Sequence, residues 1–186
     1  MNDRIATRND FNFFLRADLK ARGHSRLPFL SQLRNPITHY QYLLRRLEFM
    51  LNFQRNYVLK ICCSILNLQF KRCGVRLGFQ VPPYTCGPGL ILVHWGSIVV
   101  SAGAKIGSNC RIHSCVNIGA GANGAPVIGN NVYIGPGAKI FGAIEIGDNV
   151  VIGANAVVNK SFPANVTIAG VPAVIIKDQS VEPSYS

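Results

Sequence analysis

An aliphatic residue recurs every six positions through the second half of the chain, and this period constrains the fold more than any other feature. The repeat is broken once, by an irregular step of ten residues. Its aliphatic positions are Val100, Ile106, Ile112, Ile118, Ile128, Ile134, Ile140, Ile146, Ile152 and Val158. A second small or modest apolar residue follows four positions later, at Ala104, Cys110, Val116, Ala122, Val132, Ala138, Ile144, Val150 and Ala156.

A period of six fits neither the period of an α-helix, about 3.6 residues, nor strands joined by turns of variable length. It is typical of a triangular coil of three short strands, whose turns stack at the strand spacing of about 4.8 Å. The aliphatic side chain then points into the prism, and a glycine after it permits the corner. The sequence therefore predicts a mainly β fold, a left-handed parallel β-helix built from hexapeptide repeats.

The irregular step between Ile118 and Ile128 carries Gly121, Asn123, Gly124 and Pro126. We expect a loop ejected from the stack of coils, because these residues favour turns. Insertions in such solenoids often carry function.

The first 80 residues predict helices. A short helix is expected from Asp10 to Arg22, and a second pattern begins at Asn35-Pro36, since proline suits the first turn of a helix. Apolar residues then recur at three- and four-residue steps as far as Leu66, and Gly74 is the expected stop. The opposite, polar face is expected to hold Arg45, Arg46, Glu48, Asn52, Arg55 and Lys60.

The domain organisation follows from this change of pattern. Residues 1–80 form a basic helical segment, 81–177 the β-helix, and 178–186 a C-terminal tail. Prolines and glycines over 82–89 predict a linker that no helix could cross.

The net charge of +11 is concentrated in the helical segment, which contains fourteen Lys and Arg but only four Asp and Glu. An anionic partner such as a lipid surface, a nucleic acid or a polyanionic substrate would explain this, and so would a solvated helical face. The aromatic residues among the arginines look like helix core, so no nucleic acid is expected. With neither a signal peptide nor an apolar run of about 20 residues, we expect a cytoplasmic protein, with peripheral contact at the inner membrane face as a further hypothesis.

The six cysteines form no CxxC pair and suit neither a zinc site nor a disulfide framework, so buried free thiols are expected. No metal is expected.

Three runs of sequence carry a resemblance to a known family: HWGSIVV (94–100), IGPGAKIFG (134–142) and AGVPA (169–173). They resemble the serine acetyltransferase branch of the hexapeptide acyltransferases over residues 90–177. The front half looks loosely like the helical lead-ins of acetyltransferases associated with capsule and exopolysaccharide synthesis.

The resemblance implies an acetyl-CoA-dependent O-acetyltransferase whose catalytic histidine maps onto His94. It implies a homotrimer with acetyl-CoA in a groove between neighbouring prisms. The small residues lining that groove map onto Gly119, Ala120, Gly135, Pro136, Gly153 and Ala154. A neutral imidazole can accept the proton of an attacking hydroxyl in a direct transfer.

Each candidate side chain also has a structural interpretation. His94 lies six positions before Val100, so the repeat phase would place it as an inward plug at the end of the prism. His113, Trp95 and Tyr84 are candidates for binding the acceptor. His113 could instead be a solvated corner residue, and the two aromatic residues could cap the open core.

Two departures from serine acetyltransferases bear on the acceptor. Val93 stands where the family has an aspartate, and no Asp or Glu occurs between Glu48 and Glu145. The loop after Ile118 lacks the family's Arg-His pair for the serine carboxylate. A buried ammonium group needs a carboxylate partner, so these losses favour a saccharide hydroxyl, on a polysaccharide or a lipid-linked sugar.

Two alternatives stay open. The first is serine O-acetylation in cysteine biosynthesis, with a carboxylate supplied across the trimer interface. The second is a non-catalytic trimeric scaffold that binds an anionic surface through its basic half. A zinc carbonic anhydrase, which shares this fold, is not favoured. Such an enzyme needs three histidine ligands, and the repeat half holds only two histidines.

Overall fold

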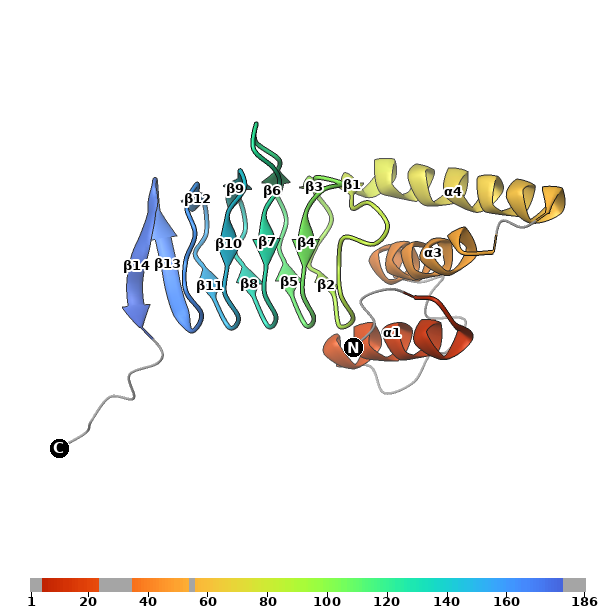
Figure 1. Ribbon diagram of the computed structural model, residues 1–186, viewed down its shortest axis with the longest axis horizontal. Coiled ribbons are helices and arrows are strands. Elements are labelled where there is room, and N and C mark those ends of the chain that lie inside the picture. Colours follow the sequence, from red (N-terminus) through yellow and green to blue (C-terminus); the bar gives the residue numbers. More distant parts are fainter. Residues whose placement is uncertain (1–4, 24–34, 54–55, 179–186) are drawn as a thin grey trace.

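The computed structural model describes residues 5–23, 35–53 and 56–178. Within these ranges, three helices lead into a long prism of short strands (Figure 1). The helices are α1 (Arg8–Ala21), α3 (Pro36–Leu51) and α4 (Tyr57–Leu77). The strands are β1 (Phe79–Gln80), β2 (Ile91–Leu92), β3 (Ile98–Val100), β4 (Lys105–Ile106), β5 (Arg111–Ile112), β6 (Val116–Gly119), β7 (Val127–Ile128), β8 (Tyr133–Ile134), β9 (Lys139–Phe141), β10 (Glu145–Ile146), β11 (Val151–Ile152), β12 (Val157–Val158), β13 (Val166–Gly170) and β14 (Ala173–Asp178).

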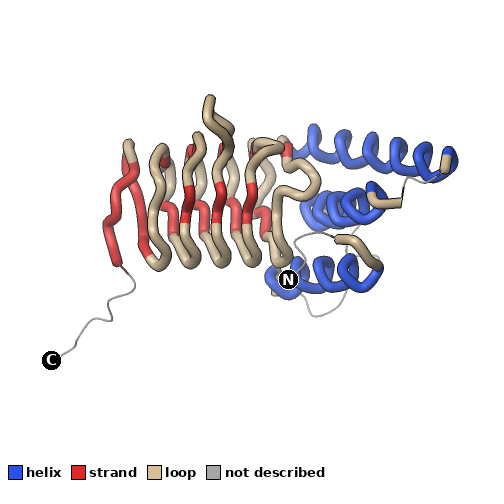
Figure 2. The backbone as a smooth tube through the Cα atoms, viewed as in Figure 1, coloured by secondary structure: helices blue, strands red, loops and turns tan. Residues whose placement is uncertain are grey.

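The strands form the faces of a parallel β-helix. The sheets have the orders β1-β3-β6-β9-β12, β10-β7-β4 and β14-β13-β11-β8-β5-β2. Every pair is parallel except β13 and β14, whose antiparallel hairpin ends the prism (Figure 2). The predicted fold class is confirmed.

The aliphatic residues of the repeat stack on one another inside the prism. One column pairs Ile112 with Ile134 and Ile134 with Ile152, and all ten aliphatic positions are at most 4% exposed. Burying each such side chain stabilises the fold by about 1.5–3 kcal/mol. The period of six is thus a packing requirement repeated once per face.

The irregular step is an ejected loop, as predicted, and it protrudes above β6 in Figure 1. Gly121 and Gly124 bridge its two sides. The prediction that Ala122 fills an inward position is wrong: the extra residues carry it out onto this exposed loop.

A column of asparagines stabilises one corner of the prism. Asn109, Asn131, Asn149 and Asn165 have φ angles of 56–61°, in the left-handed region that asparagine tolerates better than most residues. The side-chain amide of each donates to the side-chain oxygen of the next, over 3.2, 3.0 and 2.8 Å. The sequence period did not reveal this ladder.

Replacing Asn131 by Ala is expected to lower the free energy of unfolding by about 2 kcal/mol. The change removes two ladder hydrogen bonds and leaves a residue with a Cβ but no local amide at φ 56°. Asn131→Gly should lower the free energy of unfolding by less, because glycine adopts this φ freely. Chemical denaturation measures both, with Asn117→Ala, exposed on β6, as the control. Equal losses in the Ala and Gly variants would contradict the conformational part of the argument.

The prediction of a linker over residues 82–89 is wrong, because this segment forms the first coil of the prism. Cys86 bridges Ile106 in parallel, and the Gly87 amide donates to the Ile106 carbonyl over 2.8 Å. Stacking on the next coil satisfies backbone groups that a linker would leave to water.

The helical pattern also divides differently from the prediction. It breaks after α3, and α4 begins after Asn56, whose side chain caps the Leu59 amide. Gly74 does not end α4 but lies buried within it, where a Cβ would stand 2.6 Å from the Phe79 carbonyl oxygen. The helix ends instead at Gly78, whose φ of 75° is left-handed.

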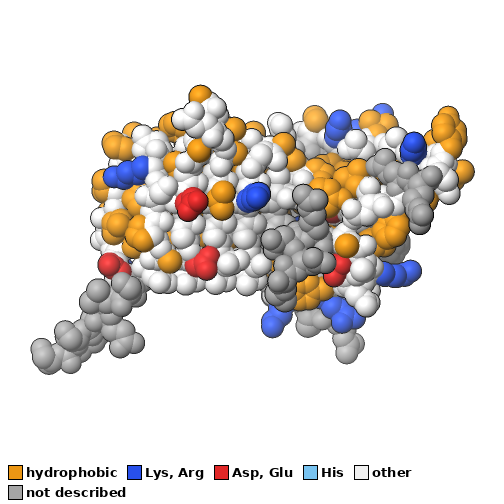
Figure 3. All heavy atoms as spheres, in the orientation of Figure 1, with side chains coloured by type: hydrophobic (Ala, Val, Ile, Leu, Met, Phe, Trp, Pro, Cys, Tyr) orange, Lys and Arg blue, Asp and Glu red, His pale blue; other side chains and the backbone are white. Residues whose placement is uncertain are grey.

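Because α4 restarts in a new phase, an apolar stripe expected in the core faces outward. Of the predicted apolar residues, Tyr57, Val58, Ile61 and Ile65 are exposed, and so are Leu68 and Val75 farther along the helix. Lys60, Lys71, Arg72 and Arg76 lie on the same helix, which has no acidic residue. Figure 3 shows apolar and basic side chains together at the helical end. An anionic partner for this segment stays a prediction, and none of the described helices is long and apolar enough to cross a membrane.

Arg45 and Glu48, expected on a polar face, are among the most buried residues of the protein. Arg45 is 0% exposed, and its guanidinium bonds both carboxylate oxygens of Asp18, over 2.8 and 3.3 Å, and Glu48 over 3.0 Å. It also donates to the carbonyls of Cys86 and Gly87 in the first coil. This ion cluster joins α1 and α3 to the prism.

All six cysteines are thiols outside any disulfide, and their burial is only partly as predicted. Cys63, Cys86 and Cys110 are buried, whereas Cys62 and Cys115 are exposed. The C-terminal tail lies outside the described residues beyond Asp178.

Candidate active site

His94 occupies a tight corner directly after β2. The Val93 amide donates to the Ile112 carbonyl of the next coil, and the Gly96 amide donates to the Leu77 carbonyl at the end of α4, each over 2.9 Å. His94 itself has a φ of 59° and an exposed side chain. The alternative of an inward plug is therefore wrong, because the left-handed corner turns the imidazole outward.

The end of α4 sets the position of this corner. A Cβ on Gly78 would lie 3.0 Å from the carbonyl carbon and oxygen of Gly96, so only glycine allows the two segments to approach this closely. The helical segment thereby fixes the backbone that carries His94.

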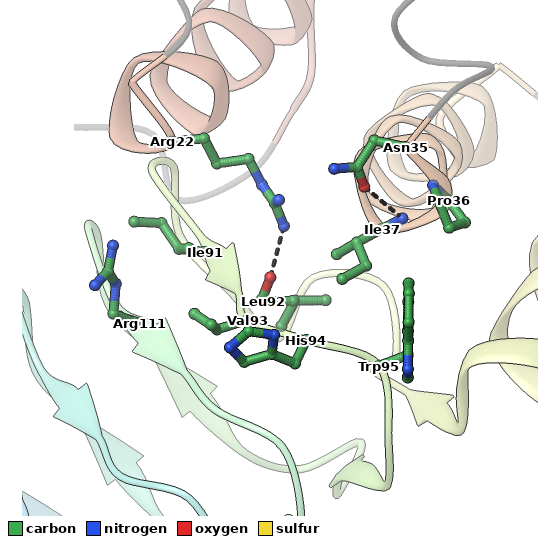
Figure 4. Close-up of a pocket in the computed structure, with 10 residues that line it drawn as sticks. All are labelled: Arg22, Asn35, Pro36, Ile37, Ile91, Leu92, Val93, His94, Trp95 and Arg111. Atoms are coloured by element: carbon green, nitrogen blue, oxygen red, sulfur yellow. Dashed lines mark hydrogen bonds between the residues drawn. The ribbon is translucent and has the colours of Figure 1, made fainter.

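His94 faces a pocket of about 480 Å³ between the helices and the first two coils (Figure 4). α1 and α3 supply one wall, and β2 and β5 supply the other. The lining residues are Arg22, Asn35, Pro36, Ile37, Ile91, Leu92, Val93, His94, Trp95 and Arg111. Trp95 is 69% exposed and lies on the side of His94 away from Arg111 (Figure 4).

His113 lies beside His94, on the corresponding corner of the next coil, but outside the pocket lining. The two ring centroids are 6.4 Å apart, and the His113 ring packs against Tyr133 at 5.0 Å. Its Nε2 is buried and has no hydrogen-bond partner among the described residues. Burial, then the charges of Arg111 and His94, lower the pKa of His113, so its neutral form is favoured.

Tyr84 does not reach the pocket. Its hydroxyl donates to the Glu48 carbonyl, and its amide donates to the Glu48 carboxylate, each over 2.7 Å. These bonds give Tyr84 a place in the junction between α3 and the first coil.

The strand register places four of the six predicted coenzyme residues on the same edge as His94. Because β2, β5, β8 and β11 pair in sequence, the residues that follow them stack in columns. Pro136 and Ala154 continue the column of His94 two and three coils along, about 10 and 14 Å away at the strand spacing. Gly135 and Gly153 lie beside them, and a Cβ on Gly135 would stand 2.7 Å from the Ile152 carbonyl oxygen.

Gly119 and Ala120 lie elsewhere in the same protomer. They end β6, which belongs to a different sheet, at the base of the ejected loop. One protomer therefore does not bring all six positions together.

Comparison with known proteins gives this site a family. The family described as "Bacterial transferase hexapeptide (six repeats)" matches residues 125–160. A serine acetyltransferase of Buchnera aphidicola is 43% identical over 101 residues, 52% of this chain and 39% of that protein. A solved serine O-acetyltransferase from Brucella melitensis has a TM-score of 0.70 and 30% identity, covering 92% of this chain and 69% of that one. The chain belongs to the serine acetyltransferase-like hexapeptide acyltransferases.

A second solved member of the family, the serine acetyltransferase of Brucella abortus, is in complex with coenzyme A. It has a TM-score of 0.72 and 28% identity, covering 92% of this chain and 70% of that one. This chain spans only 39% of the length of the Buchnera relative.

The prediction of a saccharide acceptor, and with it of a role in polysaccharide synthesis, is wrong. The Buchnera relative and both Brucella structures are serine acetyltransferases, which favours the alternative stated beside it. The prediction rested on groups missing near His94 in the sequence. It overlooked two cationic groups, Arg22 and Arg111, that the fold brings to the pocket from distant positions.

No sequence signal marked Arg22, which ends α1 and is separated from His94 by most of the helical segment. Arg111 precedes the inward Ile112 by one position, so strand alternation could have placed it outside, two residues from His113. Within the described parts of the chain, no group of three His, Cys, Asp or Glu side chains could hold a metal ion.

Proposed function

We propose that this acyltransferase transfers the acetyl group of acetyl-CoA to the hydroxyl of serine. The observation that carries the proposal is that the His94 side chain points outward into an open pocket. The edge of the prism that holds His94 continues along Gly135-Pro136 and Gly153-Ala154. Its relatives' names supply the acceptor, and the coenzyme A complex of the Brucella abortus enzyme supports the donor.

In the proposed reaction His94 accepts the hydroxyl proton as the oxygen attacks the thioester carbonyl. The new bond joins the acceptor oxygen to the acetyl carbon, and the carbon–sulfur bond breaks. The proton passes from the imidazolium to the departing thiolate. The transfer is direct, and no acetyl-enzyme forms.

The coenzyme would lie along the edge that begins at His94. Gly135, Pro136, Gly153 and Ala154 would form one wall, since small residues let a thin pantetheine arm approach the backbone closely. In a homotrimer a neighbouring prism would supply Gly119 and Ala120 to the opposite wall. The proposal therefore includes a trimer whose grooves lie between protomers.

The test measures free thiol released from acetyl-CoA with L-serine, and identifies the product by mass spectrometry. We expect thiol release that depends on serine, with one O-acetylserine formed per thiol. A reaction without acceptor gives the background hydrolysis. Turnover with neutral sugars but not with serine, or no turnover with either, would contradict the proposal.

A further inference from the structure

Two arginines approach the pocket of His94 from opposite walls. Arg22 comes from the end of α1, and Arg111 comes from β5, where its side chain is exposed (Figure 4). Burial is the main cause that lowers the pKa of Arg22, and the positive charge of Arg111 lowers it further, although nearby Asp18 opposes both. Both guanidinium groups stay protonated in a protein at neutral pH.

Arg22 is held in place rather than free in solvent. Its Nε donates to the side-chain oxygen of Gln41 and its Nη2 to the carbonyl of Leu92, each over 2.7 Å. Gln41 is itself fixed by donating to the Leu90 carbonyl over 2.6 Å. The Nη1 of Arg22 forms no hydrogen bond to any described residue. The protein thus pre-orients one guanidinium at the pocket wall and leaves part of it unused by those residues.

Among the described residues, no carboxylate lines this pocket to balance the two charges. The nearest acid, Asp18, is 4% exposed and already saturated by Arg45 and by the amides of Gly89 and Leu90. Uncompensated cations of this kind favour an anionic ligand, and guanidinium groups match carboxylate geometry well. Among the described lining side chains, an ammonium group would find two uncharged acceptors. The Asn35 side-chain oxygen already accepts from the amides of Ile37 and Thr38, and His94 is the base of the proposed reaction.

We propose that Arg22 and Arg111 bind the carboxylate of the acceptor, and that the site recognises no α-ammonium group. The acceptor class is then the short hydroxy acids, of which serine is one member whose amino group contributes little. This inference rests on the proposed function, because it assigns the orientation of the same acceptor. The carboxylate is held on the arginine side, and the hydroxyl reaches His94.

The chain contains a direct probe of this pocket. Trp95 is the only tryptophan and lies in the lining, so its fluorescence reports occupancy independently of turnover. Four hydroxyl compounds distinguish the groups that the pocket recognises. Glycerate has a carboxylate, L-serine has a carboxylate and an ammonium group, ethanolamine has only the ammonium group, and glycerol has neither. Titration calorimetry with the same four compounds gives a second measure of binding.

Glycerate and L-serine are expected to bind with dissociation constants within about tenfold of each other, and ethanolamine and glycerol at least 100-fold more weakly. Arg111→Gln should weaken the binding of both acids by about ten- to a hundredfold, because it removes a charge-assisted hydrogen bond. Arg111→Lys should recover part of that loss. Arg76→Gln, an exposed arginine on α4, is the matched control and should bind both acids normally.

Binding of L-serine at least 100-fold tighter than glycerate would overturn the inference, since it would show recognition of the ammonium group. Ethanolamine binding as well as the acids, or no binding heat with either acid, would also overturn it. Acetyl transfer is measured separately. Glycerate binding without any acetyl transfer would refute the proposed function and leave the carboxylate site standing. Acetyl transfer to serine, with glycerate neither bound nor acetylated, would support the proposed function and overturn the inference.

Discussion

Replacing His94 by Ala is expected to lower the rate of acetyl transfer by about 10²- to 10⁴-fold, the usual contribution of a positioned general base. No other imidazole lines the pocket within the described chain, because His113 stands outside the lining. Free-thiol release at saturating acetyl-CoA measures the loss. The dissociation constant for glycerate or serine should change much less, because the arginines and not His94 hold the carboxylate.

A matched control separates catalysis from folding. His39→Ala removes a half-buried histidine of α3 that is outside the pocket lining, and it should keep near-normal turnover. Added imidazole should restore part of the activity of His94→Ala, because the vacated corner is open to solvent. Turnover of His94→Ala within about threefold of the wild type would remove His94 from its role as the base.

The repeat half could be predicted from sequence because every hexapeptide faces the same local demand. Ile112, Ile134 and Ile152 each fill one face of one coil, and each contacts the equivalent residue of the next coil. Such a fold needs no distant pairing that a linear pattern would hide. The period failed only at Ala122, where an insertion takes the chain out of the stack.

The helical half was harder because its burial depends on partners far away in the sequence. Arg45 looks like a surface residue by helical position, yet its partners are Asp18 on α1 and two carbonyls of the first coil. Gly74 looks like a helix stop, yet it makes room for Phe79. Local propensity carries no information about either contact.

The same limit explains what was missed at the site. The run that contains His94 predicts it as the catalytic base, but its outward direction depends on a left-handed corner held by α4. Arg22 and Arg111 are 89 residues apart. They line one pocket because Arg22, at the end of α1, donates to the Leu92 carbonyl of β2, the strand that pairs with β5. The proposed acceptor site therefore has no contiguous motif.

Arg45→Met is expected to lower the free energy of unfolding by about 3–5 kcal/mol, a large share of the 5–15 kcal/mol typical of a folded domain. The change leaves Asp18 and Glu48 buried at 4% and 1% exposure without their cation. It also strips a donor from the Cys86 and Gly87 carbonyls, which tie the helices to the first coil. Arg46→Met, on the exposed neighbour, should change stability by less than about 0.5 kcal/mol. Urea denaturation measures both.

The pH dependence of this loss identifies its cause. Burial already raises the pKa of Glu48 despite the opposing charge of Arg45, and removing that charge should raise it further. A carboxyl with a raised pKa binds protons more tightly in the folded state, so stability falls as the pH rises above its ordinary value of 4.5. The stability deficit of Arg45→Met should therefore be largest at neutral pH and shrink toward pH 4.5.

Adding Glu48→Gln to that variant should recover part of the neutral-pH loss, because the buried charge is then absent. The Phe14 ring centroid lies 5.0 Å from the Arg45 guanidinium. A loss of stability that is independent of pH and unchanged by Glu48→Gln would therefore be due to packing around Phe14 and not to the buried charges.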